Sequence, residues 1–374
     1  MATNRRDYSA VLETIRCIDE ADGIGKGEPY LWTISVRIGG DDIRQSPDDP
    51  FRLIGAPHYY FGAGSHNNIG GGMDAGDTRN IPGPVGTFGS AICPIELSVL
   101  GNTIQIPGVM GLIVILMEED NVSDSGAEAG HQALNDLVVS RVNGFLNGIN
   151  LLEIYTEVSS LISGTDKTIE QGAVEVLKSK FNDLKEQLVN DGQSVIKNAI
   201  KNEQNIFENL WSWINADDFV GAEMFLQTTD ELLANGKQID IEGRFNDGDG
   251  DYEIKGRFTL SSVKIPVGEL PPGTDRLRVE SIATAYSYHH NVDYITYVGG
   301  SVNGFPWILH KYTGASLIRN GAMSFYVQAE DGSETAILAA NHPDSGSLYM
   351  RTTPNDTTED NLLSLPPLAF YLND

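Results

Sequence analysis

Cysteine is scarce in this chain, whose 374 residues include only Cys17 and Cys93. Two cysteines cannot form the disulfide framework that holds small secreted domains together. Both lie in apolar, strand-like stretches. We therefore expect two buried free thiols rather than a disulfide.

Long apolar runs are missing as well. No run of about 18 consecutive apolar residues is present, so we expect no transmembrane helix. The N-terminus, MATNRRDYSAVLETIRC, carries basic residues but lacks the apolar centre of a signal peptide. We expect a protein that is cytoplasmic when made, and release or export without a classical signal peptide stays open.

Positive charge is also in short supply. Lys and Arg total 25 against 52 Asp and Glu, which gives a formal net charge of -27. A field of this sign repels phosphate backbones, so we expect no nucleic-acid partner. It also opposes docking on anionic lipid unless bound cations reverse the local charge. The excess of acid fits either a highly soluble surface or a surface that binds cations.

Catalytic motifs are absent from the sequence. It contains no G-x-S-x-G nucleophile elbow, no H-E-x-x-H and no P-loop. The glycine-rich stretch 58–78 reads as a mobile surface loop, because no strand leads into it and no helix pattern follows. We expect a binding protein rather than an enzyme. A hydrolase using paired carboxylates is the enzymatic alternative.

The chain does contain many short strand-like runs and, with 40 glycines, many turns. Runs such as YLWTISVRI and GLIVILM precede a helical stretch, and EMFLQ, QIDIEGRF and YEIKGRFTL follow it. We predict one discontinuous β-sandwich from residues 1–124 and 215–264. Residues 265–275, IPVGELPPGTD, read as a linker. Residues 276–374 are predicted to form a small C-terminal α+β domain with a short helix at 315–321.

Residues 125–214 form the predicted helical insertion. Apolar residues recur at helical spacing, and the predicted breaks are SGTD at 163–166 and NDG at 190–192. Such stripes usually pack in a core. The alternative is a membrane-active unit of a bacterial pore-forming or insecticidal-type toxin, because Trp211 and Trp213 suit a membrane interface. If the unit interrupts one sandwich, GLIVILM and EMFLQ must be neighbours, and a short linker replacing 126–213 should leave a folded β protein.

Carboxylates gather at three places where apolar strands begin or end. The groups are Asp19, Glu20, Asp22 and Glu28; Glu118, Glu119, Asp120 and Asp124; and Asp217 and Asp218. Calcium takes about six to eight oxygen ligands, which converging loops at one end of a sandwich can supply. Without a cation such a cluster repels itself. Solvated loop tips are the simpler interpretation, and NDGDGDYE at 246–253 reads as a hairpin turn.

The acidic stretches resemble the calcium loops of C-two domains, the β-sandwich found in protein kinase C and synaptotagmin. DEADGIGKGEPYLW is similar to the first calcium loop, with Glu28 in place of an aspartate, and IVILMEEDN resembles the strand ending in Asp-x-Asp. NADDFVG is similar to the Asp-Asp-Phe-Ile-Gly that opens the next strand. The resemblance implies an antiparallel C-two-like sandwich. It also implies a calcium site formed by Asp22, Glu28, Glu118, Asp120, Asp217 and Asp218.

Two departures separate the chain from the C-two pattern. Glutamates stand at Glu28 and Glu118, and the helical insertion occupies the position of a short calcium loop. The C-terminal stretch SLYMRTTPNDTTEDNLLSLP resembles the tail of a small bacterial domain of unknown function. The sequence thus predicts a mostly β, non-enzymatic, calcium-dependent binding or assembly protein. Its partner would be a protein, glycan or lipid surface, and self-association is open.

Overall fold

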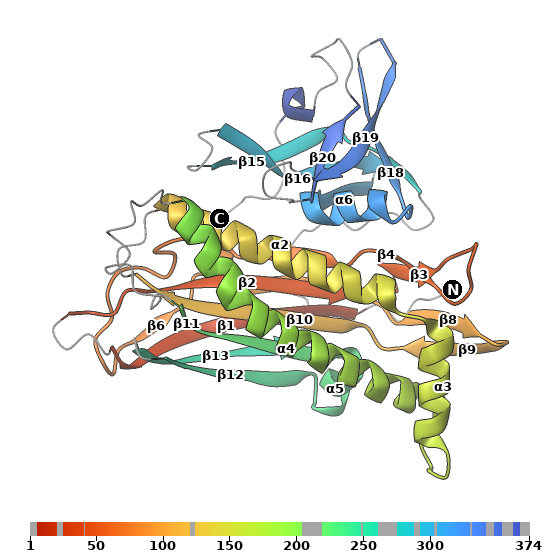
Figure 1. Ribbon diagram of the computed structural model, residues 1–374, viewed down its shortest axis with the longest axis horizontal. Helices are drawn as coiled ribbons and strands as arrows, with labels where there is room; N and C mark the ends of the chain where they lie inside the picture. Colours follow the sequence, from red (N-terminus) through yellow and green to blue (C-terminus); the bar gives the residue numbers. More distant parts are fainter. Residues whose placement is uncertain are drawn as a thin grey trace.

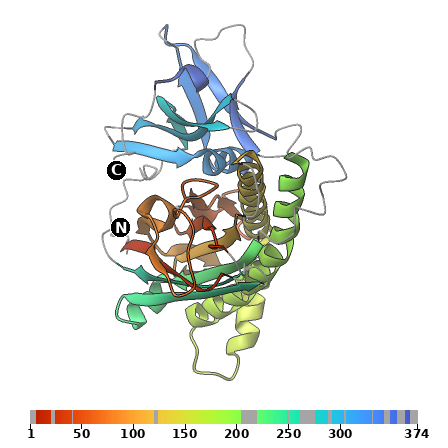
Figure 2. The same ribbon diagram turned by 90° about the vertical axis from the view of Figure 1, so that its left-hand side faces the viewer.

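The computed structural model describes residues 6–20, 25–40, 42–119, 124–203, 219–247, 250–260, 275–287, 292–302, 305–329, 331–341, 348–353 and 362–366. Two antiparallel sheets lie face to face, and long helices cover the outer face of one of them (Figures 1 and 2). A small α+β domain lies against this three-layer body. The predicted fold class is therefore confirmed: mostly β, with an inserted helical unit.

The two sheets of the sandwich have different neighbours. The first sheet contains β12 (Gln238–Asp247), β13 (Gly250–Thr259), β1 (Arg6–Asp19), β6 (Thr78–Asn80) and β7 (Thr87–Ile92). The second has the order β11 (Phe219–Thr228), β10 (Val109–Glu118), β2 (Pro29–Ile38) and β5 (His58–Phe61). Smaller elements are the hairpins β3 (Ile43–Gln45) with β4 (Leu53–Gly55) and β8 (Ile95–Val99) with β9 (Asn102–Ile106), and the short helices α1 (Gly83–Gly86) and α5 (Thr229–Ala234).

The second sheet is the middle layer, so its central strands are buried on both faces. All ten residues of β2 are buried. In β10, Leu112 and Val114 belong to the core between the two sheets, whereas Ile113 and Ile115 belong to the core shared with the helices. A strand covered on both sides reads as a continuous apolar run rather than an alternating one. This explains the run GLIVILM in the sequence.

The third layer consists of α2 (Asp124–Gly148), α3 (Leu151–Ile162) and α4 (Ile169–Glu203). The predicted break at 163–166 is confirmed, since it separates α3 from α4. The predicted break at 190–192 is wrong, because α4 continues through it. Leu188 and Ile196 are both buried on either side of that stretch, and burial outweighs the cost of about 1 kcal/mol for one helical glycine. Instead the chain turns before α3, where the Asn150 side chain accepts hydrogen bonds from the N–H groups of Leu152 and Glu153.

The strands on either side of the helical unit pair directly, as the sequence predicts. Ile113 of β10 lies opposite Met224 of β11. The helices are not merely an insertion in a loop. Their apolar stripes pack in one core with the outer face of the second sheet. The Trp32 ring of β2, for example, stacks on His131 of α2 with centroids 5.3 Å apart. The helical unit is therefore a structural layer of the fold.

The described residues of the C-terminal domain form two small sheets, one α-helix and one 3-10 helix. They comprise β14 (Arg276–Arg278), β15 (Ser281–Ser287), β16 (Val292–Val302), β17 (Phe305–His310), α6 (Lys311–Arg319), β18 (Ser324–Gln328), β19 (Glu334–Asn341), β20 (Leu348–Thr352) and a 3-10 helix (Leu362–Ser364). Helix α6 faces the rest of the chain. Asn143 of α2 donates to Ser316 Oγ at 2.8 Å, and Asn320 donates to the Gly55 carbonyl at 2.7 Å. The predicted linker 265–275 lies almost wholly outside the described residues, so that boundary stays a prediction.

The stretch 58–78, expected to be a mobile surface loop, is tied to β2. It begins as strand β5. The Asn68 side chain then accepts from the Leu31 N–H at 3.0 Å and donates to the Leu31 carbonyl at 2.6 Å. The indole of Trp32 donates to the Ser65 carbonyl at 2.8 Å. These side-chain contacts replace a strand neighbour along part of β2, which local composition does not reveal.

Candidate functional site at the acidic end of the sandwich

Several strand ends meet at one end of the sandwich, on the left in Figure 1. Strands β1 and β10 finish there, β2 and β11 begin there, and β12 is followed there by β13. The pairing places Pro29 opposite Glu118 and Asp19 opposite Asp251. We name this region the acidic end; its described carboxylates are Asp19, Glu20, Glu28, Glu118, Glu119 and Asp251. The described strand ends that carry these carboxylates therefore lie at the same end of the sandwich.

Two of the six predicted calcium ligands, Glu28 and Glu118, are described, and they lie together. Glu118 is 1% exposed. Its Oε1 accepts a hydrogen bond from the Glu28 N–H at 2.9 Å, and the Glu119 N–H donates to the Glu28 carbonyl at 3.2 Å. The first and second acidic groups are therefore joined through Glu28. The other four predicted ligands, Asp22, Asp120, Asp217 and Asp218, lie outside the described residues.

Residues 25–28 are clamped against the sandwich by their backbone. The Gly27 N–H donates to the Met73 carbonyl at 3.1 Å, and the Met73 N–H donates to the Gly27 carbonyl at 2.7 Å. A Cβ atom at Gly27 would lie 2.2 Å from the Tyr252 hydroxyl. Only glycine permits so close an approach of the backbone. The position of this segment beside Glu118 is therefore built into the fold.

The rim of the acidic end carries nitrogen-bearing side chains next to its carboxylates. His66 Nε2 lies 3.2 Å from Glu119 Oε2. Arg244 Nε donates to Asp251 Oδ1 at 2.9 Å, and the hydrogen bonds from Arg244 lower the pKa of Asp251. Behind this rim, burial lowers the pKa of His131 to about 4, so this imidazole is neutral at pH 7. The histidine next to the Trp32 ring thus adds no charge to the region.

The potential metal ligands at the acidic end are hard oxygen donors. Carboxylates and backbone carbonyls suit calcium better than a soft metal. Burial raises the pKa of Cys17 to about 11, so this nearby thiol stays protonated and is a poor metal ligand. Among the residues that the structure describes, no three His, Cys, Asp or Glu side chains form a group able to hold a metal ion. The predicted site therefore depends on its four remaining aspartates.

Sequence reasoning missed a buried ion pair between the sheets. Arg37 binds Asp42 through two hydrogen bonds of 3.1 and 2.5 Å, and its third donor reaches Ser90 Oγ at 2.7 Å. Asp42 also accepts from the Gly39 N–H at 2.9 Å and lies 2.6 Å from His58 Nδ1. Burial opposes the Asp42 charge, but Arg37 and His58 outweigh it and hold the pKa of Asp42 at about 2. The one available signal is polar alternation within YLWTISVRI.

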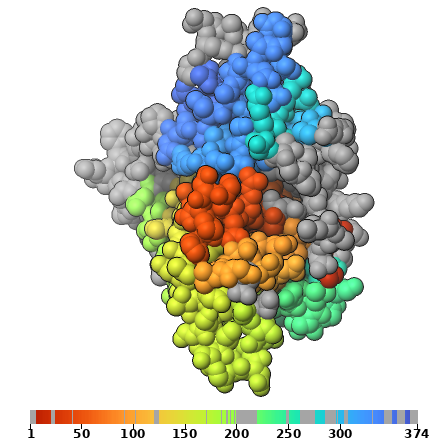
Figure 3. Space-filling model, turned by 90° about the vertical axis from the view of Figure 1, so that its right-hand side faces the viewer, coloured from red at the N-terminus to blue at the C-terminus, as the bar shows by residue number. Residues whose placement is uncertain are grey.

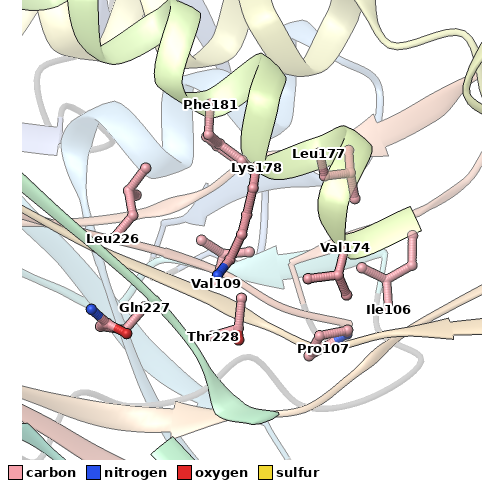
Figure 4. A pocket seen from close by; sticks show the side chains of 10 residues that line it. All are labelled: Ile106, Pro107, Val109, Val174, Leu177, Lys178, Phe181, Leu226, Gln227 and Thr228. Atoms are coloured by element: carbon pink, nitrogen blue, oxygen red, sulfur yellow. The ribbon is translucent and has the colours of Figure 1, made fainter. Parts of the chain in front are cut away.

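A small crevice lies far from the acidic end, between α4 and the sheet (Figure 4). Its lining is mostly apolar: Ile106, Pro107, Val109, Val174, Leu177, Lys178, Phe181, Leu226, Gln227 and Thr228. Lys178 forms an ion pair with Glu231. Figure 3 shows this opposite end of the molecule, with the β8–β9 hairpin in orange above the yellow-green α3. The crevice lacks converging polar groups, so it offers no chemistry of its own.

Comparison with known proteins gives a family match over the C-terminal part of the chain. No curated protein and no solved structure matches the chain. No described helix is long and apolar enough to cross a membrane. Residues 283–366 match a family described as "Protein of unknown function (DUF3892)". The C-terminal part is therefore similar to a small domain of unknown function, as its sequence predicts.

Proposed function

We propose that this protein is a calcium-dependent binding or assembly protein and that the acidic end is its cation site. One observation carries the proposal. The buried Glu118 carboxylate holds Glu28 at the place where four strand ends meet. A buried carboxylate among other acidic groups is costly unless charge or hydrogen bonds compensate it. Glu118 already accepts the Glu28 N–H, and a bound cation would add a further favourable interaction for its charge.

The proposed ligands are the six residues of the C-two-like pattern. Glu28 and Glu118 would bind through their carboxylates, with Asp22, Asp120, Asp217 and Asp218 completing the site. Support comes from the pairing of β10 with β11, because it brings the chain leaving at 118 and the chain returning at 219 to the same edge. Binding would relieve carboxylate repulsion and fix the loops in one arrangement. It would also reverse the local charge, so that an anionic protein, glycan or lipid surface could dock on a chain of net charge -27.

Calorimetry and thermal unfolding in EDTA and in millimolar calcium test this function, with magnesium as the competing ion. At a free calcium concentration of about 100 times Kd, the free energy of unfolding should rise by about 2.7 kcal/mol. Glu118→Gln, Asp120→Asn and Asp218→Asn should each weaken binding, because each removes one charge while keeping the side-chain shape.

The matched control is Glu96→Gln, which changes an exposed carboxylate on β8 at the other end of the sandwich. It should bind calcium as the unmodified protein does. Without calcium, the two aspartate variants should be slightly more stable than the unmodified protein, because repulsion is relieved. No heat and no change in melting temperature at millimolar calcium would remove the calcium site from consideration.

The packing of the helical unit does not favour the membrane-active alternative. The apolar stripes of α2 and α4 face the second sheet, so few apolar side chains among the described residues of the unit are available to a lipid surface. Trp211 and Trp213 lie outside the described residues. Dye release from liposomes at acid and neutral pH tests this alternative, and we expect the liposomes to remain intact.

A further inference from the structure

Strand β12 is a long sheet edge that lies along the lower border of the sandwich in Figure 1. It has ten residues, and it pairs with β13 from Gln238 to Asp247 without a register shift. Among the residues that the structure describes, no strand pairs with its other side. It contains no proline. Natural edge strands are usually short, bulged, interrupted by proline or covered, because a bare edge invites pairing with another chain.

Other edges of the sandwich show these protections. Strand β6 has only three residues. The pairing of β11 with β10 contains a register shift at Leu116 and Met117. The edge strand β5 is covered by the C-terminal domain, where Thr313 Oγ1 accepts from the Tyr59 N–H at 3.5 Å. Strand β12 is therefore a long and regular edge, and its remaining protection is the charge of its exposed side chains Asp240, Glu242 and Arg244.

The backbone of β12 is oriented for pairing. The Leu260 N–H donates to the Lys237 carbonyl at 2.9 Å, just beyond the end of the β12–β13 ladder. Hydrogen-bonded pairs recur at every second residue of an antiparallel ladder. The odd-numbered residues of β12 thus bond to β13, and the even-numbered residues direct their N–H and C=O groups outward. These same even-numbered residues have exposed side chains, from Gln238 to Asn246.

The exposed side chains of β12 are self-complementary about Gly243. Two antiparallel copies related by a two-fold axis at Gly243 would place Glu242 of each copy opposite Arg244 of the other, whose guanidinium also binds Asp251 within its own chain. Asp240 would lie opposite Asn246. Opposite charges facing each other across a strand pair are stabilising. The register also matches the outward backbone groups, because all of its hydrogen-bonded pairs join even-numbered residues, and it allows about eight hydrogen bonds.

The side of β12 that faces the sandwich presents no obstacle to this pairing. Ile241 and Phe245 are buried in the core between the sheets. At the proposed axis, Gly243 has no side chain, and the Phe225 ring of β11 covers it from within the sandwich, 3.1 Å from where a Cβ atom would stand. Glycine at the centre therefore leaves room for the two strands to meet while the core remains closed beneath them.

We propose that β12 is a self-association surface, through which a second copy of this chain adds its own β12 antiparallel, centred on Gly243. The partner is the same chain, because the charges of the strand complement themselves. The high net negative charge opposes the encounter of two copies. Association should therefore strengthen as added salt screens that repulsion up to about 0.15 M, where the Debye length is about 8 Å.

Sedimentation equilibrium of the full chain in EDTA, from about 1 to 100 μM, tests the proposal. The unmodified protein should show a monomer–dimer equilibrium. Glu242→Arg sets arginine opposite arginine. Arg244→Glu sets glutamate opposite glutamate and also removes the ion pair with Asp251. Each variant alone should self-associate roughly tenfold or more weakly. An equimolar mixture of the two variants restores both opposite-charge pairs, so it should form the heterodimer.

Two further variants separate edge pairing from other effects. Glu242→Pro removes an outward N–H that β13 does not use, so it should abolish association while the circular dichroism spectrum is retained. Lys167→Glu reverses an exposed charge in the turn between α3 and α4, away from β12, and should leave association unchanged. The proposal is overturned if the unmodified protein stays monomeric at about 100 μM, or if folded Glu242→Pro protein dimerises normally. EDTA keeps this outcome separate from the calcium proposal.

Discussion

Replacing residues 126–213 by a short Gly-Ser linker tests what the helical unit does. The sequence alone suggests that a folded β protein should survive, because loop-closure entropy changes slowly with length. The structure argues for the opposite result. The helices share a core with the outer face of the second sheet, and the linker would expose that face to water.

The size of the effect follows from the side chains that would lose their cover. Nine of them on β2, β10 and β11 belong to the core shared with the helices: Tyr30, Trp32, Ile34, Val36, Ile38, Ile113, Ile115, Met117 and Met224. Full burial of one such side chain contributes about 1.5–3 kcal/mol. Exposing only half of their area would therefore cost about 7–13 kcal/mol, whereas the net stability of a protein is about 5–15 kcal/mol.

We therefore expect the linker variant to be insoluble, or compact without fixed packing. Soluble expression, near-ultraviolet circular dichroism and binding of a hydrophobic dye measure this. The matched control replaces only the exposed residues 163–168 between α3 and α4, which should cost little. A soluble linker variant with a cooperative transition near the wild-type melting temperature would refute the reasoning and show that the helices are dispensable.

Three further predictions concern stability. Asp42→Asn removes the charged partner of the buried Arg37, so denaturant unfolding should show a loss of about 3–5 kcal/mol in stability. Because the pKa of Asp42 in the folded protein is about 2, below the usual value, its contribution to stability is present above about pH 4 and is lost as the pH falls towards 2. An Asp42→Asn variant whose stability changes with acid pH as the unmodified protein's does would contradict this. Leu134→Ala, on the buried stripe of α2, should lower the free energy of unfolding by about 2–5 kcal/mol. Leu161→Ala changes a partly exposed residue of α3 and should lower it by less than about 1 kcal/mol. Equal effects in denaturant unfolding would mean that α2 is not packed on the sheet. Asn150→Ala removes the cap of α3 and should lower stability by about 0.5–2 kcal/mol in thermal unfolding, and no change would show that the cap is unimportant.

Local sequence patterns predict much of the secondary structure. The strands, their order and the helical character of 125–203 follow from residue spacing, because side-chain direction repeats every two residues in a strand and about every 3.6 in a helix. The short helix α5 could also have been predicted from the sequence. Thr228 and Glu231 have capping-box spacing, and the structure forms that box. Acidic residues at strand ends were visible for the same reason, since their place in the chain marks where each strand stops.

Only the tertiary structure shows which elements pack against each helix and strand. An apolar stripe on a helix is the same whether it faces a sheet or a lipid, and contacts such as Trp32 with His131 join distant parts of the chain. The Arg37–Asp42 pair likewise exists because two sheets close over it. The continuity of α4 past Gly192 depends on burial at Leu188 and Ile196, which outweighs local helix propensity. The spacing of apolar residues predicts whether a segment is a helix or a strand. The segments that it packs against depend on burial between distant parts of the chain, which local spacing does not reveal.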